Sequence, residues 1–95
     1  MHVISIAPLR IFWQKHSTSE EPLKAWYRTL EKAEFSNFSE LKETFNTVDK
    51  VGDFYVFNVH GNHVRVIAAI HFNRKKVFIR HVLTHTDYDR GDWKS

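Results

Sequence analysis

Residues 54–85 read FYVFNVHGNHVRVIAAIHFNRKKVFIRHVLTH, and this stretch decides the fold. Three runs rich in β-branched and aromatic residues are separated by two short turn signals, which predicts a three-stranded antiparallel meander. Gly61-Asn62 indicates a two-residue hairpin loop, because glycine supplies the positive φ that a type II′ turn needs. With this loop, Asn58 faces Arg65 across the hairpin.

The predicted register sorts the side chains of the first hairpin onto two faces. One face is wholly apolar and is expected to be buried: Tyr55, Phe57, Val59, Val64, Val66, Ala68, Ile70 and Phe72. The other face mixes apolar with polar or basic residues: Val56, Asn58, His60, His63, Arg65, Ile67, Ala69 and His71. A face of this composition is expected to contact something other than the protein's own core.

The second hairpin offers more than one register. Placing Arg74-Lys75 in the loop sets Phe72 opposite Val77, adds Leu83 to the apolar face and puts Arg80 on the polar face. This register is preferred because it completes the apolar face, although it turns two histidines toward the helices. A three-residue loop would move every side chain to the opposite face.

The N-terminal half predicts a short edge strand at residues 2–6, followed by helices. Thr18 and Glu21 fit a capping box for the central helix, whose apolar stripe is expected to lie on the sheet. Apolar spacing places the helical segments at residues 8–16, 20–34 and 36–48. Residues 49–53 are predicted to be a turn that leads into the sheet, and residues 86–95 a short polar tail. The chain is thus predicted to be α+β, with a small antiparallel sheet (a short N-terminal strand plus the meander) and two or three N-terminal helices packed on one face.

Length and composition indicate a single domain over residues 1–95. Hydrophobic residues make up 42% and charged residues 26%, as in globular proteins. No stretch approaches the ~20 apolar residues of a membrane span, and no signal peptide is apparent. The absence of cysteine excludes disulfides and thiolate chemistry. We therefore expect a cytoplasmic protein without membrane contacts.

Positive charge is concentrated in the C-terminal half. Residues 1–50 carry seven Lys or Arg and seven Asp or Glu, whereas residues 51–95 carry seven Lys or Arg and four Asp. The excess of three positive charges on the predicted sheet favours an anionic partner such as nucleic acid. Ordinary surface charge explains the same numbers equally well.

Seven histidines raise the question of a metal site. His60 and His63 flank the first turn, while His81 and His85 are four residues apart, which on a strand separates side chains by ~13 Å. A metal site needs three or four converging ligands. We therefore interpret these histidines as surface or nucleic-acid-contacting residues and expect no metal and no cofactor. Serine-nucleophile and phosphate-loop motifs are also missing.

Four residues fit metal-free RNA cleavage: Arg65, Arg80, His85 and Tyr88. Such a reaction needs a base for the 2′-hydroxyl, cations for the charged phosphorane and an acid for the leaving oxygen. Histidine and tyrosine can transfer protons, and arginine clamps phosphate. Each residue also has a purely structural interpretation, as an arginine at a sheet edge, a satisfied histidine at a strand end or a packing tyrosine.

Two motifs resemble the HigB family of bacterial toxins, within the RelE-like superfamily. They are Asn-x-x-Gly-Asn-x-x-Arg from Asn58 to Arg65, and Thr-His-x-x-Tyr-Asp from Thr84 to Asp89. The resemblance implies a ribosome-dependent mRNA endonuclease that is inhibited by a helix-turn-helix antitoxin (HigA-like), with DNA contacted only through that antitoxin. It also implies an RNA-binding concavity on the sheet face opposite the helices.

Residue by residue, the resemblance assigns catalytic roles to the four residues named above, with acid and base unassigned. The residues that we expect to bind RNA are Lys50, Asn58, His60, His63, Arg74, Lys75 and Lys76. Two rival functions stay open: a relative of the same fold that poisons a topoisomerase, and a non-catalytic RNA- or protein-binding module. Codon preference and antitoxin stoichiometry are not predicted.

Overall fold

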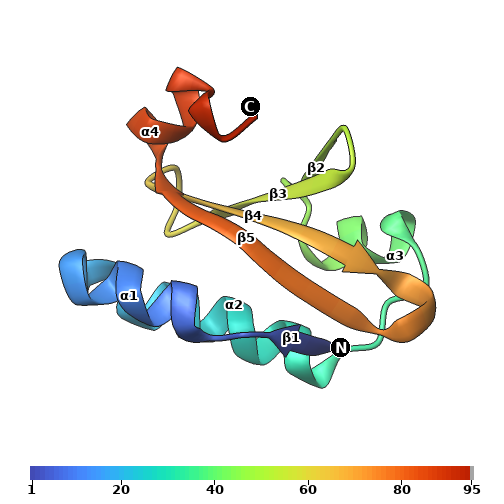
Figure 1. Ribbon diagram of the computed structural model, residues 1–95. Coiled ribbons are helices and arrows are strands. Elements are labelled where there is room, and N and C mark those ends of the chain that lie inside the picture. The colour runs from blue at the N-terminus through green and yellow to red at the C-terminus, as the bar shows by residue number, and fades with distance from the viewer. Residues whose placement is uncertain (95) are drawn as a thin grey trace.

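Residues 1–94, which the computed structural model describes, form a five-stranded mixed sheet in the order β1-β5-β4-β3-β2 (Figure 1). This architecture confirms the predicted α+β class. The elements are β1 (His2–Ile4), α1 (Ala7–Lys15), η1 (Ser17–Ser19), α2 (Glu20–Lys32), α3 (Phe38–Thr44), β2 (Asp49–Val51), β3 (Phe54–Val59), β4 (Val64–His71), η2 (Phe72–Arg74), β5 (Lys76–Thr84), α4 (His85–Arg90) and η3 (Asp92–Lys94).

The first hairpin has the predicted register. Asn58 pairs with Arg65, and the flanking valines of β3 and β4 pair with each other. Gly61 has the expected positive φ of 61°. His60 shares this left-handed conformation, with φ of 56°, so two successive residues turn the chain.

The predicted register of the second hairpin is wrong. Val77 pairs with Ile70 and not with Phe72. Farther along, a β-bulge leaves Arg80 as an extra residue between the paired positions of β4 and β5. Beyond the bulge the side-chain alternation is reversed, so Leu83 leaves the helix-covered face and lies on the opposite one. Alternation alone conceals such a bulge, because β5 carries apolar residues on both faces.

The two short strands form the edges of the sheet. β1 lies at an edge as predicted, but it runs parallel to β5, with Val3 opposite Val77. The rest of the chain separates these two strands and supplies the long connection that parallel pairing needs. Residues 49–51 were predicted to be a turn; they instead form β2, where Lys50 pairs with Tyr55 of β3.

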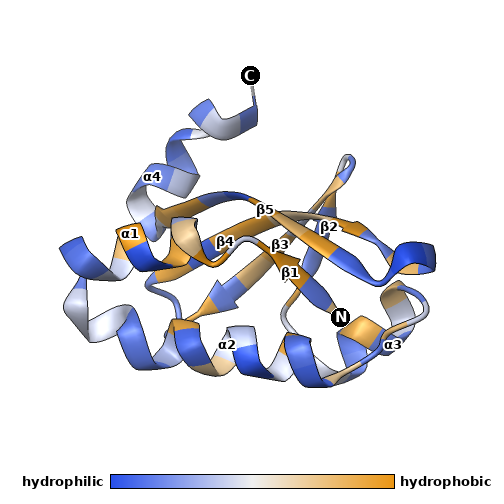
Figure 2. Ribbon diagram, turned by 60° about the horizontal axis from the view of Figure 1, so that its bottom comes forward, coloured by the Kyte–Doolittle hydropathy of each residue, from blue (hydrophilic) through white to orange (hydrophobic). Residues whose placement is uncertain are grey.

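Helices α1, α2 and α3 cover one face of the sheet, and their hydrophobic sides point toward it (Figure 2). The predicted stripe of α2 is buried, and the Trp26 ring meets Phe57 edge-on with centroids 5.2 Å apart. The predicted capping box is wrong. Ser19 precedes α2 without a side-chain cap bond, because η1 winds residues 17–19 into a 3-10 turn.

The opposite face of the sheet is covered in part by the C-terminal segment. α4 and η3 fold back over it, where sequence reasoning expected only a short polar tail (Figure 1). Trp93 is 8% exposed and forms a small second core with Val56 and Ile67. None of the helices within residues 1–94 is long and apolar enough to cross a membrane.

Candidate active site

Arg65 is the buried cation of the face that α4 overlies. It is the second residue of β4 and is only 6% exposed. Its Nη1 donates to the backbone oxygens of Asn62 (3.2 Å) and Val64 (3.3 Å), and its Nη2 donates to Asn62 Oδ1 (2.5 Å) and His85 Nδ1 (3.1 Å). All four acceptors are neutral groups. A desolvated guanidinium among neutral partners is suited to receive an anion.

His85 has a defined tautomer in this arrangement. Arginine has no acceptor atom, so Nδ1 of His85 must accept the Arg65 hydrogen bond and the ring proton must be on Nε2. Nε2 lies 3.2 Å from Oδ2 of Asp89, one helical turn farther on. His85 is therefore a neutral imidazole held between a cation and a carboxylate, an arrangement suited to accepting a proton.

Tyr88 forms a wall of the site. Its ring lies 5.5 Å from the Arg65 Cζ atom, within the range of cation–π attraction. The ring also stacks on Trp93 with centroids 5.3 Å apart, and the Trp93 indole N–H donates to the Tyr88 carbonyl (3.2 Å). The phenol is thereby fixed beside the guanidinium.

Local sequence explains why α4 begins where it does. Oγ1 of Thr84 accepts a hydrogen bond from the Asp87 backbone N–H (3.1 Å), which caps the helix, and Gly91 with φ of 76° ends it. The His85 backbone N–H donates to the His63 carbonyl (2.9 Å), which ties the helix to the first hairpin. Because helical neighbours are three and four residues apart, His85 shares one side of α4 with Tyr88.

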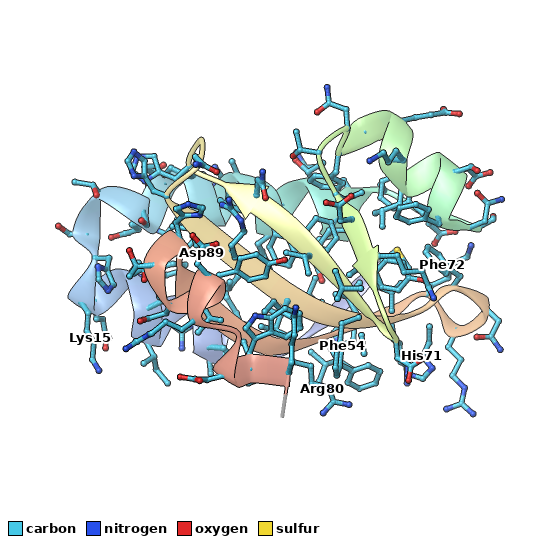
Figure 3. The ribbon with its side chains drawn as sticks, turned by 90° about the horizontal axis from the view of Figure 1, so that it is seen from above. Lys15, Phe54, His71, Phe72, Arg80 and Asp89 are labelled. Carbon is cyan, nitrogen blue, oxygen red and sulfur yellow. The ribbon has the colours of Figure 1, made fainter. Side chains whose placement is uncertain are left out.

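Three of the four predicted catalytic residues come together here: Arg65, His85 and Tyr88. Arg80 does not join them. It is exposed on the β5 bulge and lies apart from Asp89 in the view from above the sheet (Figure 3).

Among the predicted RNA-binding residues, three lie near this cluster. Asn58 is exposed and pairs with Arg65 across the hairpin. His60 and His63 occupy the turn that carries Asn62, and their ring centroids are 5.0 Å apart.

The predicted RNA-binding lysines and Arg74 lie elsewhere. Lys50 pairs with Tyr55, whose ring is part of the helix-side core, so Lys50 is at the margin of that face. Lys75 donates to a backbone carbonyl of the α2–α3 connection (3.0 Å). Arg74 and Lys76 flank it in the β4–β5 turn, at the opposite end of β4 from Arg65.

Sequence reasoning missed two members of the cluster, Asn62 and Asp89. Both lie in the motifs that resemble the HigB family, but the sequence assigns neither a role at the site. The role of Asp89 follows only if residues 85–90 are read as a helix, and the Thr84-x-x-Asp87 cap followed by Gly91 is the available signal. Within residues 1–94, no three His, Asp or Glu side chains are grouped closely enough to hold a metal ion.

Comparison with known proteins defines the class and then the family. Residues 19–91 match a family model described as the RelE-like toxic component of a toxin–antitoxin system. This range includes the Arg65 cluster, which consists of Asn62, Arg65, His85, Tyr88 and Asp89. That model is the HigB toxin, and the chain belongs to the HigB toxin family. It is thus the toxin of a toxin–antitoxin pair, with an antitoxin as its partner.

Curated relatives match over nearly their whole length. The mRNA interferase HigB of Escherichia coli strain CFT073 is 34% identical over 93 residues, which cover 95% of this chain and 90% of that protein. The mRNA interferase toxin HigB of Escherichia coli K12 is 36% identical over 92 residues, which cover 94% and 88%. The protein from Shigella flexneri, also an mRNA interferase HigB, matches to the same extent.

Proposed function

We propose that this chain is an endoribonuclease that cuts mRNA on the ribosome without a metal ion and thereby inhibits translation. The observation that carries the proposal is the buried Arg65 guanidinium, which has neutral partners and lies beside a neutral histidine and a tyrosine. The names of the relatives support mRNA as the substrate. With 95 residues and a formal charge of +3, the chain has little surface of its own for holding a long RNA, which favours message held by the ribosome.

The first step is binding of the scissile phosphate by Arg65. A phosphate oxygen is a stronger acceptor for the guanidinium than an imidazole nitrogen or an amide oxygen, because it carries negative charge and a phosphate can accept two parallel hydrogen bonds from one guanidinium. The phosphate therefore displaces His85 Nδ1 from Nη2 and supplies the negative charge that the buried cation lacks.

The next step is attack by the 2′-hydroxyl. His85 Nδ1, released from Arg65, takes the hydroxyl proton, and Asp89 stabilises the resulting imidazolium through Nε2. The 2′-oxygen bonds to phosphorus, and Arg65 stabilises the phosphorane. The bond to the 5′-oxygen then breaks as Tyr88 donates its phenolic proton. The products are a 2′,3′-cyclic phosphate and a 5′-hydroxyl end.

Exposed cations outside the cluster would contact other phosphates of the message. Arg80 on the bulge and Arg74 with Lys76 in the β4–β5 turn are exposed and free to do this. We assign them, Asn58 and the turn histidines to RNA binding. Lys50 and Lys75 are weaker candidates, since one lies on the helix side and the other is bonded to a carbonyl.

The antitoxin partner is proposed to be a HigA-like protein with a helix-turn-helix domain, through which alone this chain would reach DNA. Because the proposed substrate is bound to the ribosome, we propose that the toxin acts in the cytoplasm. Tagged Arg65→Ala protein, purified from the native host, should bring down a helix-turn-helix protein encoded beside it. Purification with a protein lacking that domain would contradict this assignment.

The experiment for the activity is a cell-free translation reaction in which 5′ ends on the message are mapped with and without stalled ribosomes. We expect new ends only on ribosome-bound message, with 5′-hydroxyl termini upon chemical analysis. Equal cutting of free RNA would contradict ribosome dependence, and 5′-phosphate ends would contradict 2′-hydroxyl attack. Uncut message in a fully active translation reaction would contradict the endonuclease assignment and favour a topoisomerase poison or a binding module.

A further inference from the structure

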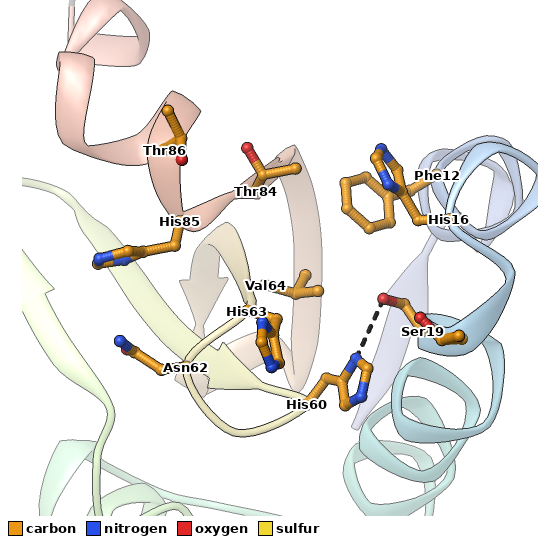
Figure 4. Close-up of a pocket in the computed structure, with 11 residues that line it drawn as sticks. Phe12, His16, Ser19, His60, Asn62, His63, Val64, Thr84, His85 and Thr86 are labelled. Carbon is orange, nitrogen blue, oxygen red and sulfur yellow. Dashed lines mark hydrogen bonds between the residues drawn. The ribbon is translucent and has the colours of Figure 1, made fainter.

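A pocket of about 570 Å³ opens at the end of the sheet beside His85 (Figure 4). It lies between the end of α1, the turn η1, the β3–β4 turn and the start of α4. The proposed chemistry uses His85 and Asn62 from its wall. His60 and His63, assigned above to RNA binding, also line it, together with Phe12, His16 and Ser19, which have no assigned role.

Aromatic rings form two sides of the pocket. Phe12 and His16 on α1 are stacked, with centroids 4.4 Å apart and planes 25° from parallel. Across the pocket, the rings of His60 and His63 lie 5.0 Å apart (Figure 4). Flat rings that also carry nitrogen donors and acceptors are the surfaces on which unpaired nucleobases stack and form hydrogen bonds.

The orientation of His60 is maintained against a conformational preference. Its φ of 56° is unusual for a residue with a side chain. The ring is held by Ser19, a buried serine that is 3% exposed and whose Oγ lies 3.3 Å from His60 Nδ1. Strained residues that the surrounding structure holds in place are concentrated at functional sites.

The pocket is directly connected to the Arg65 cluster. Asn62 and His85 line the pocket, and both accept hydrogen bonds from Arg65. Val64 also lines the pocket. Because successive strand residues point to opposite faces of the sheet, the next residue, Arg65, lies on the other face at the same end of β4. A phosphate bound at Arg65 therefore places the base of an adjoining nucleotide at the mouth of the pocket.

We propose that this pocket binds one unpaired nucleobase of the message next to the cleaved phosphate and sets the base preference of cleavage. The proposal rests on the RNA cleavage proposed above. It assigns base stacking to His16, His60 and His63. Phe12 supports the His16 ring, and Ser19 is a positioning residue that holds His60.

Binding is tested without catalysis, by NMR of the histidine ring resonances in the parent protein, because a nucleoside 5′-monophosphate contains no phosphodiester bond to cleave. The four nucleoside 5′-monophosphates are the probes, and inorganic phosphate is the control. We expect the His16, His60 and His63 rings to shift with at least one nucleotide, to different extents for different bases, and not with phosphate. Shifts that phosphate reproduces, or no shifts of these three rings, would overturn the proposal.

Cleavage specificity is tested with His60→Gly. Glycine accepts a positive φ, which offsets the loss of the hydrogen bond to Ser19, so this variant should remain folded. We expect the ratio of cutting at the preferred base to cutting at other bases to fall roughly tenfold, the lower range for loss of one stacked base. Ser19→Ala should have a smaller effect in the same direction, and His2→Ala, an exposed histidine on β1, should have none.

The outcomes separate this inference from the proposed function. A folded His60→Gly protein that cuts with the parental base preference would overturn the base pocket and leave the nuclease assignment intact. If the parent protein cuts no RNA, the nuclease assignment fails, and the nucleotide titration alone decides whether the pocket binds bases.

Discussion

Arg65 differs from the other arginines of this protein in its surroundings. Arg28 and Arg80 are exposed, whereas Arg65 is buried and its donors are directed at neutral groups. Taking a charge out of water costs several kcal/mol, and hydrogen bonds to neutral acceptors recover only part of it. The folded toxin thus keeps a cation in place for an anionic substrate, and the same burial fixes the hydrogen-bond geometry of His85.

The His85 tautomer is a direct consequence of this geometry. Long-range ¹H–¹⁵N NMR should show Nε2 protonated and Nδ1 unprotonated in the free toxin at neutral pH. Asp89→Asn removes the carboxylate that orients the ring, so we expect cleavage to fall roughly tenfold, part of the 10²–10⁴ that general acid–base catalysis supplies. The control is Asp53→Asn in the β2–β3 turn. A protonated Nδ1 in the parent protein would contradict the assignment.

Tyr88→Phe separates the hydroxyl from the ring. Phenylalanine keeps the stacking on Trp93 and the ring beside Arg65, so the fold should be retained. Loss of the proton donor should slow cleavage about 10²-fold. Single-turnover cleavage rates on ribosome-bound message measure the effect. An unchanged rate would remove the Tyr88 hydroxyl from the mechanism.

At the residue scale, the sequence was sufficient to predict the site residues that belong to motifs. Arg65, His85 and Tyr88 are predicted from the sequence and lie together in the structure. Their motifs are short stretches, the first hairpin and Thr-His-x-x-Tyr, whose local structure can be read from the sequence. Arg80 is predicted near Arg65 because side chains of a regular strand alternate between faces, and the β5 bulge interrupts that alternation. Asp89 was missed because its role depends on α4.

The element on which the site depends most is α4. With six residues it is too short to be stable as an isolated helix, and it relies on its cap and on the packing of Trp93. It carries the proposed base and the proposed acid. Any change that unwinds α4 should therefore reduce cleavage even when the sheet is intact.

Thr84→Ala tests this dependence. Loss of the cap bond to the Asp87 N–H should destabilise α4 by about 1 kcal/mol. Hydrogen exchange of the α4 amides should accelerate roughly fivefold, cleavage should decrease, and the β3–β4 amides should be unaffected. Thr29→Ala is the control, since Thr29 is exposed on α2. Equal exchange and equal cleavage in both variants would show that the cap is unimportant.

Element boundaries followed the strength of the local pattern. α2 and the β3–β4 hairpin were predicted well, because a long apolar stripe and a glycine turn are strong signals. The prediction of a turn at residues 49–51 fails because these three residues become a strand only by pairing with β3. α4 was overlooked because its two apolar contacts, Tyr88 and Trp93, lie on either side of Gly91 and show no helical period.

At the scale of the whole molecule, the two faces of the sheet have separate tasks. The helix side contains the main core, whereas the other side carries the Arg65 cluster over a small second core. The predicted apolar face of the first hairpin is the one that the helices cover, so this sidedness was available from the sequence. The partial cover of the second face by α4 and η3 was not.

Phe57 connects the layers of the main core and is 1% exposed, with Trp26 and Phe45 edge-on at 5.2 Å each. Phe57→Ala should lower the free energy of unfolding by roughly 3–5 kcal/mol, a large share of what a small domain possesses. Urea unfolding curves measure this loss. Ile11→Ala, at an exposed position of α1, should shift the unfolding midpoint little. A similar loss in both variants would contradict the proposed position of the core.

The central claim is that the buried guanidinium of Arg65 drives RNA cleavage. The most direct measurement compares cut 5′ ends on ribosome-bound message for Arg65→Lys and Arg28→Lys, after circular dichroism and thermal melting have shown that both are folded. Lysine keeps the charge but loses the forked donors, so we expect roughly a hundredfold loss of cutting in Arg65→Lys and parental cutting in Arg28→Lys. Parental cutting by folded Arg65→Lys would contradict the account.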